Sequence, residues 1–175
     1  MTNLSSIQAS EYEAWSLNEW LDHLSALHPK NIEMGLERVA TVFKQLNISF
    51  SKQTVVTVAG TNGKGTTCAF LEQSCLAAGK KVGVYSSPHL IQYTERVRIN
   101  GMDGSEQAHC RAFQAVERAR GDIPLTYFEF GTLAGLKLVH DANVDIALLE
   151  VGLGGRLDAV NVVSPNIAVI TSIDL

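Results

Sequence analysis

The residues best suited to chemistry lie in a glycine-rich segment, Gly60-Thr-Asn-Gly-Lys-Gly-Thr66, which follows a short β-branched run and precedes a helical pattern. Its glycines let successive backbone N–H groups turn inward, and the following helix adds its N-terminal dipole, so the segment can hold an anion. Lys64 supplies a mobile positive charge for the β- and γ-phosphates of a triphosphate, and Thr66 or Thr67 offers a hydroxyl near Mg²⁺. The nucleotide-binding candidates are Gly60, Thr61, Asn62, Gly63, Lys64, Gly65 and Thr66.

This segment departs from the standard phosphate-loop pattern, G-x-x-x-x-G-K-[ST]. Val58 stands where the first glycine belongs, and Gly65 separates Lys64 from Thr66. One alternative is a glycine-rich turn that binds nothing. Another is a dinucleotide-binding loop, for which the glycines have the reversed spacing G-x-x-G-x-G. The order of strand, loop, lysine and helix favours phosphate binding.

Two possible oxygen ligands for a metal follow other predicted strands. Glu150 ends the apolar run 146–149 and precedes glycines. A carboxylate there can hold Mg²⁺ directly or through water, and the alternative is a strand-end glutamate that faces solvent. Ser87 lies in Ser86-Ser-Pro-His89, where its hydroxyl also suits Mg²⁺, although Ser-Ser-Pro is common in turns as well. Ser87 and Glu150 are therefore the candidate metal ligands.

Two further segments offer contacts for a substrate. Gly152-Leu-Gly-Gly-Arg-Leu-Asp158 allows close backbone approach, and Arg156 and Asp158 either orient a substrate or pair with each other. Thr126-Tyr-Phe-Glu129 opens a predicted helix, and its first and last residues fit a capping box. The two rings between them belong to the core or to a face on which a flat ring stacks.

The apolar pattern predicts the elements that position these residues. Helices are expected at about 16–27, 35–46, 66–78, 105–119 and 127–140, and buried strands at 54–59, 82–85, 146–149 and 167–170, with 97–100 as an edge strand or hairpin arm that turns at Asn100-Gly101. Strands that alternate with helices predict an α/β fold, a parallel sheet with helices on both faces. Such sheets bind ligands at the carboxyl ends of their strands, which here carry residues 60–66, 86–89, 150–158 and 171–174.

Composition narrows the class of protein. The chain has 175 residues, a formal net charge of -4 and 46% hydrophobic residues, which fits one globular domain and argues against nonspecific nucleic-acid binding. Its three cysteines form no CxxC pair, which indicates reduced thiols in a cytoplasmic protein. No signal peptide or membrane-spanning run is visible, so no membrane partner is expected.

Taken together, the motifs resemble those of the bacterial folylpolyglutamate synthase/dihydrofolate synthase enzymes, which belong to the Mur ligase superfamily. The resemblance runs from about Trp15 to Leu175, and the inserted Gly65 is the family's own form of the loop. The matching segments, in the family's order, are Gly60-Thr-Asn-Gly-Lys-Gly-Thr66, Tyr85-Ser-Ser-Pro-His-Leu90, Thr94-Glu-Arg-Val-Arg98, Thr126-Tyr-Phe-Glu129 and Leu149-Glu-Val-Gly-Leu-Gly-Gly-Arg-Leu-Asp158.

The resemblance implies a P-loop NTPase-like fold and an ATP-dependent, Mg²⁺-dependent ligase. Such an enzyme adds L-glutamate to dihydropteroate, or to folates as a polyglutamate tail, through an acyl phosphate. We expect a monomer with small-molecule substrates. The alternatives are another Mur-type amide ligase and a non-ligase P-loop module that only binds nucleotide.

The resemblance also implies roles for individual residues. Lys64 and Glu150 become the catalytic candidates, with Ser87 and Glu150 as Mg²⁺ ligands. The implied substrate contacts are Pro29, Lys30, Asn31, Thr126, Tyr127, Phe128, Glu129, Leu157, Asp158 and Ala159.

Length is where the chain departs from the family, whose members are about twice as long or more. We therefore expect residues 1–175 to be the N-terminal part of the ATP-binding domain: a helical segment with a substrate loop over 1–50 and the P-loop core over 51–175. A histidine Mg²⁺ ligand, a lysine that is carboxylated in many members and a C-terminal glutamate-ligase domain would then be absent. Such a fragment is expected to be inactive alone.

Overall fold

Four apolar runs pair as the parallel centre of a six-stranded sheet in the computed structural model, which describes residues 12–27, 35–153 and 155–174. The strand order is β4-β3-β2-β5-β1-β6. Strands β2, β5, β1 and β6 are parallel, as the sequence predicts. The strands are β1 (Thr54–Ala59), β2 (Val82–Tyr85), β3 (Val97–Ile99), β4 (Met102–Asp103), β5 (Ile146–Glu150) and β6 (Ile167–Ile170).

A hairpin of β3 and β4 makes the sheet mixed rather than wholly parallel. It turns at Asn100 and Gly101, whose φ angles of 52° and 80° suit the tight turn predicted there. The Asn100 side chain also accepts a hydrogen bond from Val82 N (2.9 Å) and so ties the turn to β2. Of the two predictions for 97–100, the hairpin arm is confirmed, and β4 rather than β3 lies at the edge of the sheet. The hairpin adds two antiparallel strands to the predicted parallel sheet.

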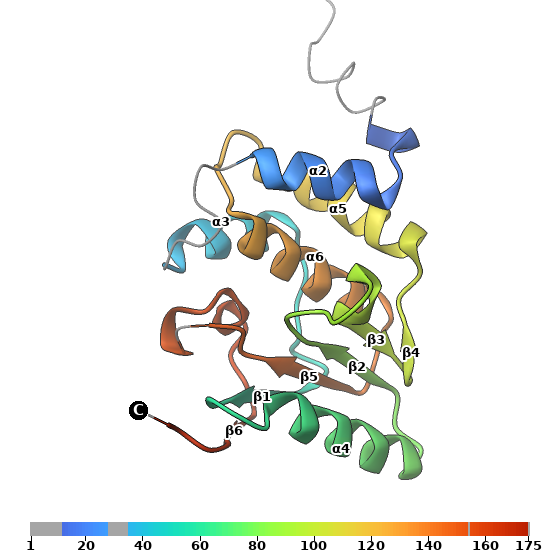
Figure 1. Ribbon diagram of the computed structural model, residues 1–175, viewed down its shortest axis with the longest axis vertical. Coiled ribbons are helices and arrows are strands. Elements are labelled where there is room, and N and C mark those ends of the chain that lie inside the picture. Colours follow the sequence, from blue (N-terminus) through green and yellow to red (C-terminus); the bar gives the residue numbers. More distant parts are fainter. Residues whose placement is uncertain (1–11, 28–34, 154, 175) are drawn as a thin grey trace, which may run out of the picture.

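Helices cover both faces of the sheet, as expected (Figure 1). Helix α4 lies on one face, whereas α6 lies on the other with α2 and α5 beyond it. The two capping boxes, Ser16 with Glu19 and Thr126 with Glu129, both form. The helices are α2 (Leu17–Ala26), α3 (Glu37–Gln45), α4 (Lys64–Ala77), α5 (Glu106–Arg120) and α6 (Tyr127–Asp141). Helix α4 begins two residues before the predicted start at Thr66, so Lys64 belongs to its first turn.

Each helical layer has its own apolar core. Val58, Val84 and Leu148 pack between the sheet and α4, and Tyr85 and Leu149 pack on the opposite face. The outer helices close over Trp20, Phe113 and Phe130, which are fully buried. Within the described ranges, no helix is long and apolar enough to cross a membrane.

Strand register brings the chemically interesting ends together. Val58 of β1 pairs with Glu150 of β5, and Tyr85 of β2 pairs with Leu149 of β5. Ala59 pairs with Ile170 at the end of β6. The segments that follow β1, β2, β5 and β6 therefore start close together, where the carboxyl ends of the parallel strands meet.

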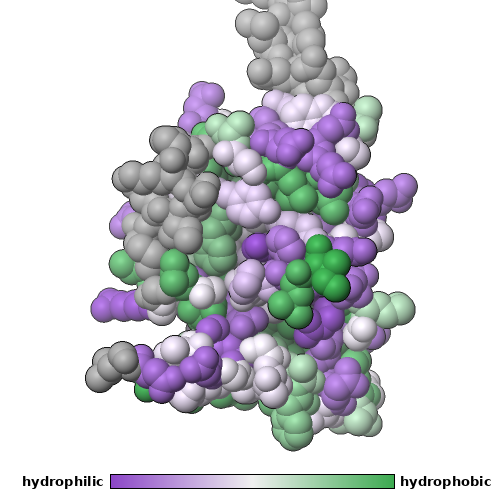
Figure 2. All heavy atoms as spheres, viewed as in Figure 1, coloured by the Kyte–Doolittle hydropathy of each residue, from purple (hydrophilic) through white to green (hydrophobic). Residues whose placement is uncertain are grey.

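One surface loop exposes apolar side chains. It lies between β2 and the short 3-10 helix Tyr93–Arg96, where Figure 2 shows a small strongly hydrophobic group. Leu90 and Ile91 are 90% and 86% exposed. The Glu95 carboxylate accepts hydrogen bonds from the backbone N–H groups of Leu90, Ile91 and Gln92, and these bonds fix the loop.

Buried His109 generates a prediction about stability and pH. Burial is the main cause that lowers its pKa, and its ring lies 3.0 Å from the Ser105 carbonyl oxygen. The unfolded chain therefore binds a proton at His109 more readily than the folded chain, and stability falls as the pH drops through about 6.5. We expect His109→Leu to lose less of its free energy of unfolding between about pH 7.5 and about pH 5.5 than the unmutated chain.

Urea unfolding at the two pH values measures this difference. Phe113→Leu removes packing beside His109 without removing a titrating group, so it should keep the full pH dependence. An equal loss of stability in His109→Leu and Phe113→Leu between the two pH values would contradict the assignment.

Candidate functional site

The loop between β1 and α4 depends on glycine at two positions. Gly60 has a φ of 138°, and a Cβ atom there would lie 1.9 Å from Thr171 Oγ1. Gly63 caps α4 in the left-handed region, with a φ of 84°. Any larger residue at Gly60 collides with the end of β6, so the loop is built for close backbone approach.

The segment after β6 clamps this loop by hydrogen bonds. Thr61 N donates to Ser172 O (2.7 Å), and Thr171 Oγ1 donates to Asn62 O (2.7 Å). The Asn62 side chain donates to the Asp174 carboxylate (2.7 Å). The sequence placed 171–174 at a strand end but assigned it no role, because nothing local marks partners about a hundred residues away.

Lys64 and the start of α4 supply positive charge at the loop. Lys64 Nζ donates to the carbonyl oxygens of Gly60 (2.8 Å) and Thr61 (3.4 Å). Among the described residues, no side chain caps the N-terminus of α4. Its first N–H groups are therefore available to an anion, in line with the predicted phosphate loop.

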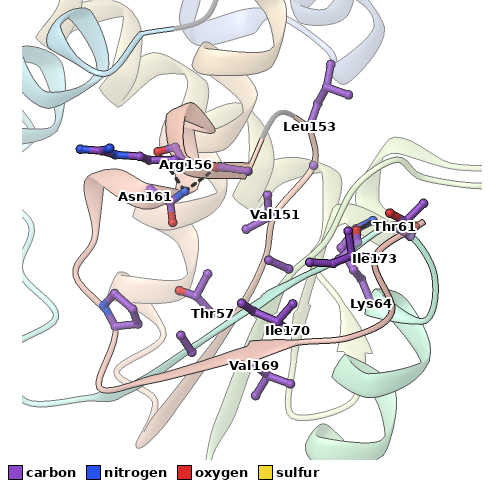
Figure 3. A pocket seen from close by; sticks show the side chains of 16 residues that line it. Thr57, Thr61, Lys64, Val151, Leu153, Arg156, Asn161, Val169, Ile170 and Ile173 are labelled. Atoms are coloured by element: carbon purple, nitrogen blue, oxygen red, sulfur yellow. Dashed lines mark hydrogen bonds between the residues drawn. The ribbon is translucent and has the colours of Figure 1, made fainter. Parts of the chain in front are cut away.

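A cavity of about 760 Å³ opens beside the loop (Figure 3). Thr61 and Lys64 lie at one end of it, and Arg156 and Asn161 lie at the other. The Asn161 side chain donates to the Gly155 carbonyl (2.7 Å) and so fixes the loop after β5. Asn161 was not singled out from the sequence, where it is an ordinary polar residue.

Glu150 and Ser87 lie together at the ends of β5 and β2. Glu150 is 6% exposed; burial raises the pKa of its carboxyl group, while a hydrogen bond from the Ser87 backbone and the charge of Lys64 lower it. Ser87 Oγ is buried and has no hydrogen-bond partner among the described residues. The predicted pair is thus brought together.

These two groups fit a hard divalent cation. An unpartnered buried hydroxyl and a desolvated carboxylate are oxygen ligands of the kind that Mg²⁺ prefers. Over the ranges described, no group of three or more His, Cys, Asp or Glu could hold a metal. Mg²⁺ would therefore complete its shell with water and phosphate oxygens, as it commonly does.

The Asp158 side chain holds the loop after β5 by binding backbone N–H groups of that loop. Its carboxylate accepts hydrogen bonds from Gly152 N (3.0 Å), Leu153 N (2.8 Å) and Val160 N (2.9 Å). Asp158 is 2% exposed, and burial raises the pKa of its carboxyl group despite these three bonds, which lower it. In the described part of the chain it forms no ion pair with Arg156, the pairing that the sequence left open.

The segment 126–129 has both structural and exposed members. Thr126 and Glu129 are buried; the Glu129 carboxylate accepts from Thr126 N (2.8 Å) and from Arg38 Nη2 (3.0 Å). Tyr127 and Phe128 remain partly exposed. A Cβ atom on Gly152 would lie 2.7 Å from Phe128 Cζ and 2.8 Å from Ser87 Oγ, so the segment adjoins the metal-ligand candidates.

The remaining substrate candidates are spread out. Leu157, in the loop after β5, is 46% exposed, whereas Ala159 is buried. Pro29, Lys30 and Asn31 lie outside the described residues.

The parallel centre of the sheet, with a glycine loop that leads from β1 into α4, defines a P-loop-type α/β protein. No family model matches the chain. The dihydrofolate synthase/folylpolyglutamate synthase of Escherichia coli (strain K12) is 55% identical over 169 residues, which cover 97% of this chain and 40% of that protein. The chain thus spans about 40% of the length of this curated relative.

Solved structures agree with this match. Escherichia coli FolC in complex with DHPP and ADP superposes with a TM-score of 0.88 at 56% identity, over 93% of this chain and 39% of that one. A bifunctional folylpolyglutamate synthase/dihydrofolate synthase with Mn, AMPPNP and L-glutamate bound gives a TM-score of 0.87 at 55% identity, over 93% and 39%. Over nearly its whole length the chain is thus similar to dihydrofolate synthase/folylpolyglutamate synthases.

The contacts of Asp158 predict its contribution to stability. Asp158→Ala leaves three backbone N–H groups without their acceptor, so we expect the free energy of unfolding to fall by about 1–3 kcal/mol. Asp122→Ala, at an exposed loop position, is the control and should change stability by less than about 0.5 kcal/mol. Urea denaturation measures both; equal, small effects would show that the three hydrogen bonds do not hold the loop.

Proposed function

We propose that the protein containing this chain is an ATP-dependent ligase that adds L-glutamate to dihydropteroate and to folates. The observation that carries the proposal is the combination of 55% identity to a curated dihydrofolate synthase/folylpolyglutamate synthase with an open, uncapped phosphate loop beside Glu150 and Ser87. Structures of its relatives contain ADP with DHPP, or AMPPNP with Mn and L-glutamate. ATP and Mg²⁺ are therefore the proposed cofactors.

In the proposed site, residues 60–66 bind the phosphates of ATP. The N–H groups at the start of α4 and the Lys64 ammonium face the negative charge that moves during transfer. Lys64 would exchange its present bonds to loop carbonyls for bonds to phosphate oxygens. Glu150 and Ser87 would hold Mg²⁺, which when bound neutralises phosphate charge.

The acid that is activated in this proposal carries flat aromatic rings. Tyr127, Phe128 and Leu157 offer exposed apolar surface for its rings, while Thr126, Glu129, Asp158 and Ala159 shape that surface from beneath. Pro29, Lys30 and Asn31 are proposed as further contacts from the sequence resemblance.

The reaction follows from the weakness of a carboxylate as an acyl donor. A carboxylate oxygen attacks the γ-phosphorus, the bond to the bridging oxygen breaks, and ADP leaves with its electron pair. The resulting acyl phosphate has a good leaving group. The amine of L-glutamate then attacks the acyl carbon, the carbon–oxygen bond to phosphate breaks, and the amine proton passes to solvent or to a base.

We also propose that residues 1–50 form a helical segment with a substrate loop and that residues 51–175 form the P-loop core. The support is that α2 and α3 precede β1, whereas every strand of the described residues lies in the second part.

Lys64→Ala tests the phosphate loop in the longer protein. Without the ammonium group the transferred phosphoryl charge loses one stabilising contact, so ADP release should fall by about 10²-fold or more. Lys80→Ala removes an exposed lysine beyond the other end of α4 and is the matched control. Unchanged ATP consumption in Lys64→Ala would refute the role of the loop.

Substrate dependence tests the proposed class of reaction. ADP release by the longer protein should require both dihydropteroate and L-glutamate, while the 175-residue chain alone should show no turnover. ADP release with a muramyl substrate instead would indicate another Mur-type ligase. Nucleotide binding without any pterin binding would indicate a module that is not a ligase.

A further inference from the structure

Arg96 is a buried arginine beside the proposed substrate surface. It is 8% exposed and ends the 3-10 helix that leads into β3. Its carbonyl oxygen accepts a hydrogen bond from Ser86 N (2.9 Å), which fastens it to the end of β2 next to Ser87. Arg96 therefore sits at the same edge of the sheet as the metal-ligand candidates.

The side chains that contact its guanidinium are neutral. Arg96 Nε donates to His89 Nδ1 (2.9 Å), so His89 accepts there as a neutral imidazole. Arg96 Cζ lies 5.1 Å from the ring centre of Tyr93 and 5.9 Å from that of Tyr127. The Tyr85 hydroxyl is a further neighbour; burial raises the pKa of Tyr85 to about 12, so it is protonated.

Other partly buried arginines of the chain have a carboxylate partner. Arg38 pairs with Glu129 (3.0 Å), Arg98 with Glu72 (2.8 Å), and Arg120 with Glu117 (2.5 Å). Arg96 is more buried than these three, yet in the described part of the chain it forms no ion pair with a carboxylate.

This arrangement is costly without an anion. A guanidinium stays charged in proteins, and burying an unpaired charge is unfavourable. Cation–π contacts with two tyrosines offset part of that cost. Several N–H donors of the guanidinium remain for a ligand, and their planar fork matches a carboxylate.

The position of Tyr127 connects Arg96 to the substrate surface. Tyr127 contacts the guanidinium and is the neighbour in sequence of Phe128, whose ring adjoins Gly152 and Ser87. An aromatic acid that lies on these rings would bring its carboxylate between Arg96 and the phosphate loop. The aromatic surroundings favour a carboxylate of such an acid over a phosphate of the nucleotide.

We propose that Arg96 binds the carboxylate of the aromatic acid substrate and orients it toward the phosphate loop. This inference rests on the proposed function, and it deepens that function by naming the residue that recognises the reacting group. Arg96 is then a substrate-binding residue, with His89 and Tyr93 as positioning residues for its guanidinium.

The test compares an acid with its neutral ester. Pteroate and pteroate methyl ester are titrated against the intact protein, its Arg96→Gln variant and its Arg96→Lys variant, with binding followed by fluorescence. We expect Arg96→Gln to weaken pteroate binding by about 10- to 100-fold and to leave ester binding unchanged within about twofold. Arg96→Lys keeps the positive charge but not the planar fork of donors, so its affinity for pteroate should lie between those of the unmutated protein and Arg96→Gln.

The controls separate recognition from folding. Arg120→Gln removes a paired arginine on α5 and should leave the acid-to-ester ratio of affinities unchanged. Arg96→Lys keeps the test decisive if Arg96→Gln does not fold. An equal loss of acid and ester binding would reduce Arg96 to a structural role and overturn the inference, as would no loss at all.

Two further outcomes separate this inference from the proposed function. If unmutated protein binds acid and ester equally, the inference fails while the ligase proposal stands. If unmutated protein binds AMPPNP but neither pterin, the proposed function fails, and this inference with it. Weaker AMPPNP binding in Arg96→Gln with unchanged pteroate binding would assign Arg96 to a phosphate and overturn the carboxylate assignment.

Discussion

The parallel pairing of β1 with β5 is the constraint on which the rest of the site depends. It sets Val58 beside Glu150, so the glycine loop leaves β1 where the Glu150 carboxylate ends β5. Side chains alternate faces along a strand, so a shift of one residue would turn Glu150 to the other face of the sheet. Backbone hydrogen bonds of the sheet thus fix the separation of groups that belong to different loops.

Around that edge, carboxylates organise the loops. Asp158 gathers three backbone N–H groups after β5, Glu95 gathers three after β2, and Glu129 caps α6 while it pairs with Arg38. Each carboxylate satisfies several donors at once, which is stronger than the same number of contacts to water. The glycine loop is held by separate hydrogen bonds to the Thr171–Asp174 segment.

The groups proposed for chemistry differ from these organising groups in one respect. Ser87 Oγ has no partner in the described structure, the pKa of buried Glu150 is raised, and the guanidinium of buried Arg96 contacts neutral side chains and forms no ion pair with a carboxylate among the described residues. A bound ligand can therefore supply the hydrogen bonds or opposite charges that the protein does not. Such preorganised, poorly solvated groups are what a site needs if it is to stabilise moving charge without first rearranging.

Features that close within a few residues could be predicted from the sequence alone. Both capping boxes, the Asn100-Gly101 turn and the glycine loop ahead of α4 form as predicted, because hydrogen bonds over three or four positions and backbone preferences decide them. The alternation of apolar runs also predicted the parallel centre of the sheet.

Three features depend on packing between distant segments: the clamp of 171–174 on the glycine loop, the backbone donors that bind Asp158, and the absence of an ion pair at Arg96 among the described residues. The clamp joins positions more than a hundred residues apart. The neutral side chains that contact the Arg96 guanidinium come from separate elements of the fold. Spacing along a chain cannot reveal which polar groups burial will leave without a partner, because burial is a property of the packed layers.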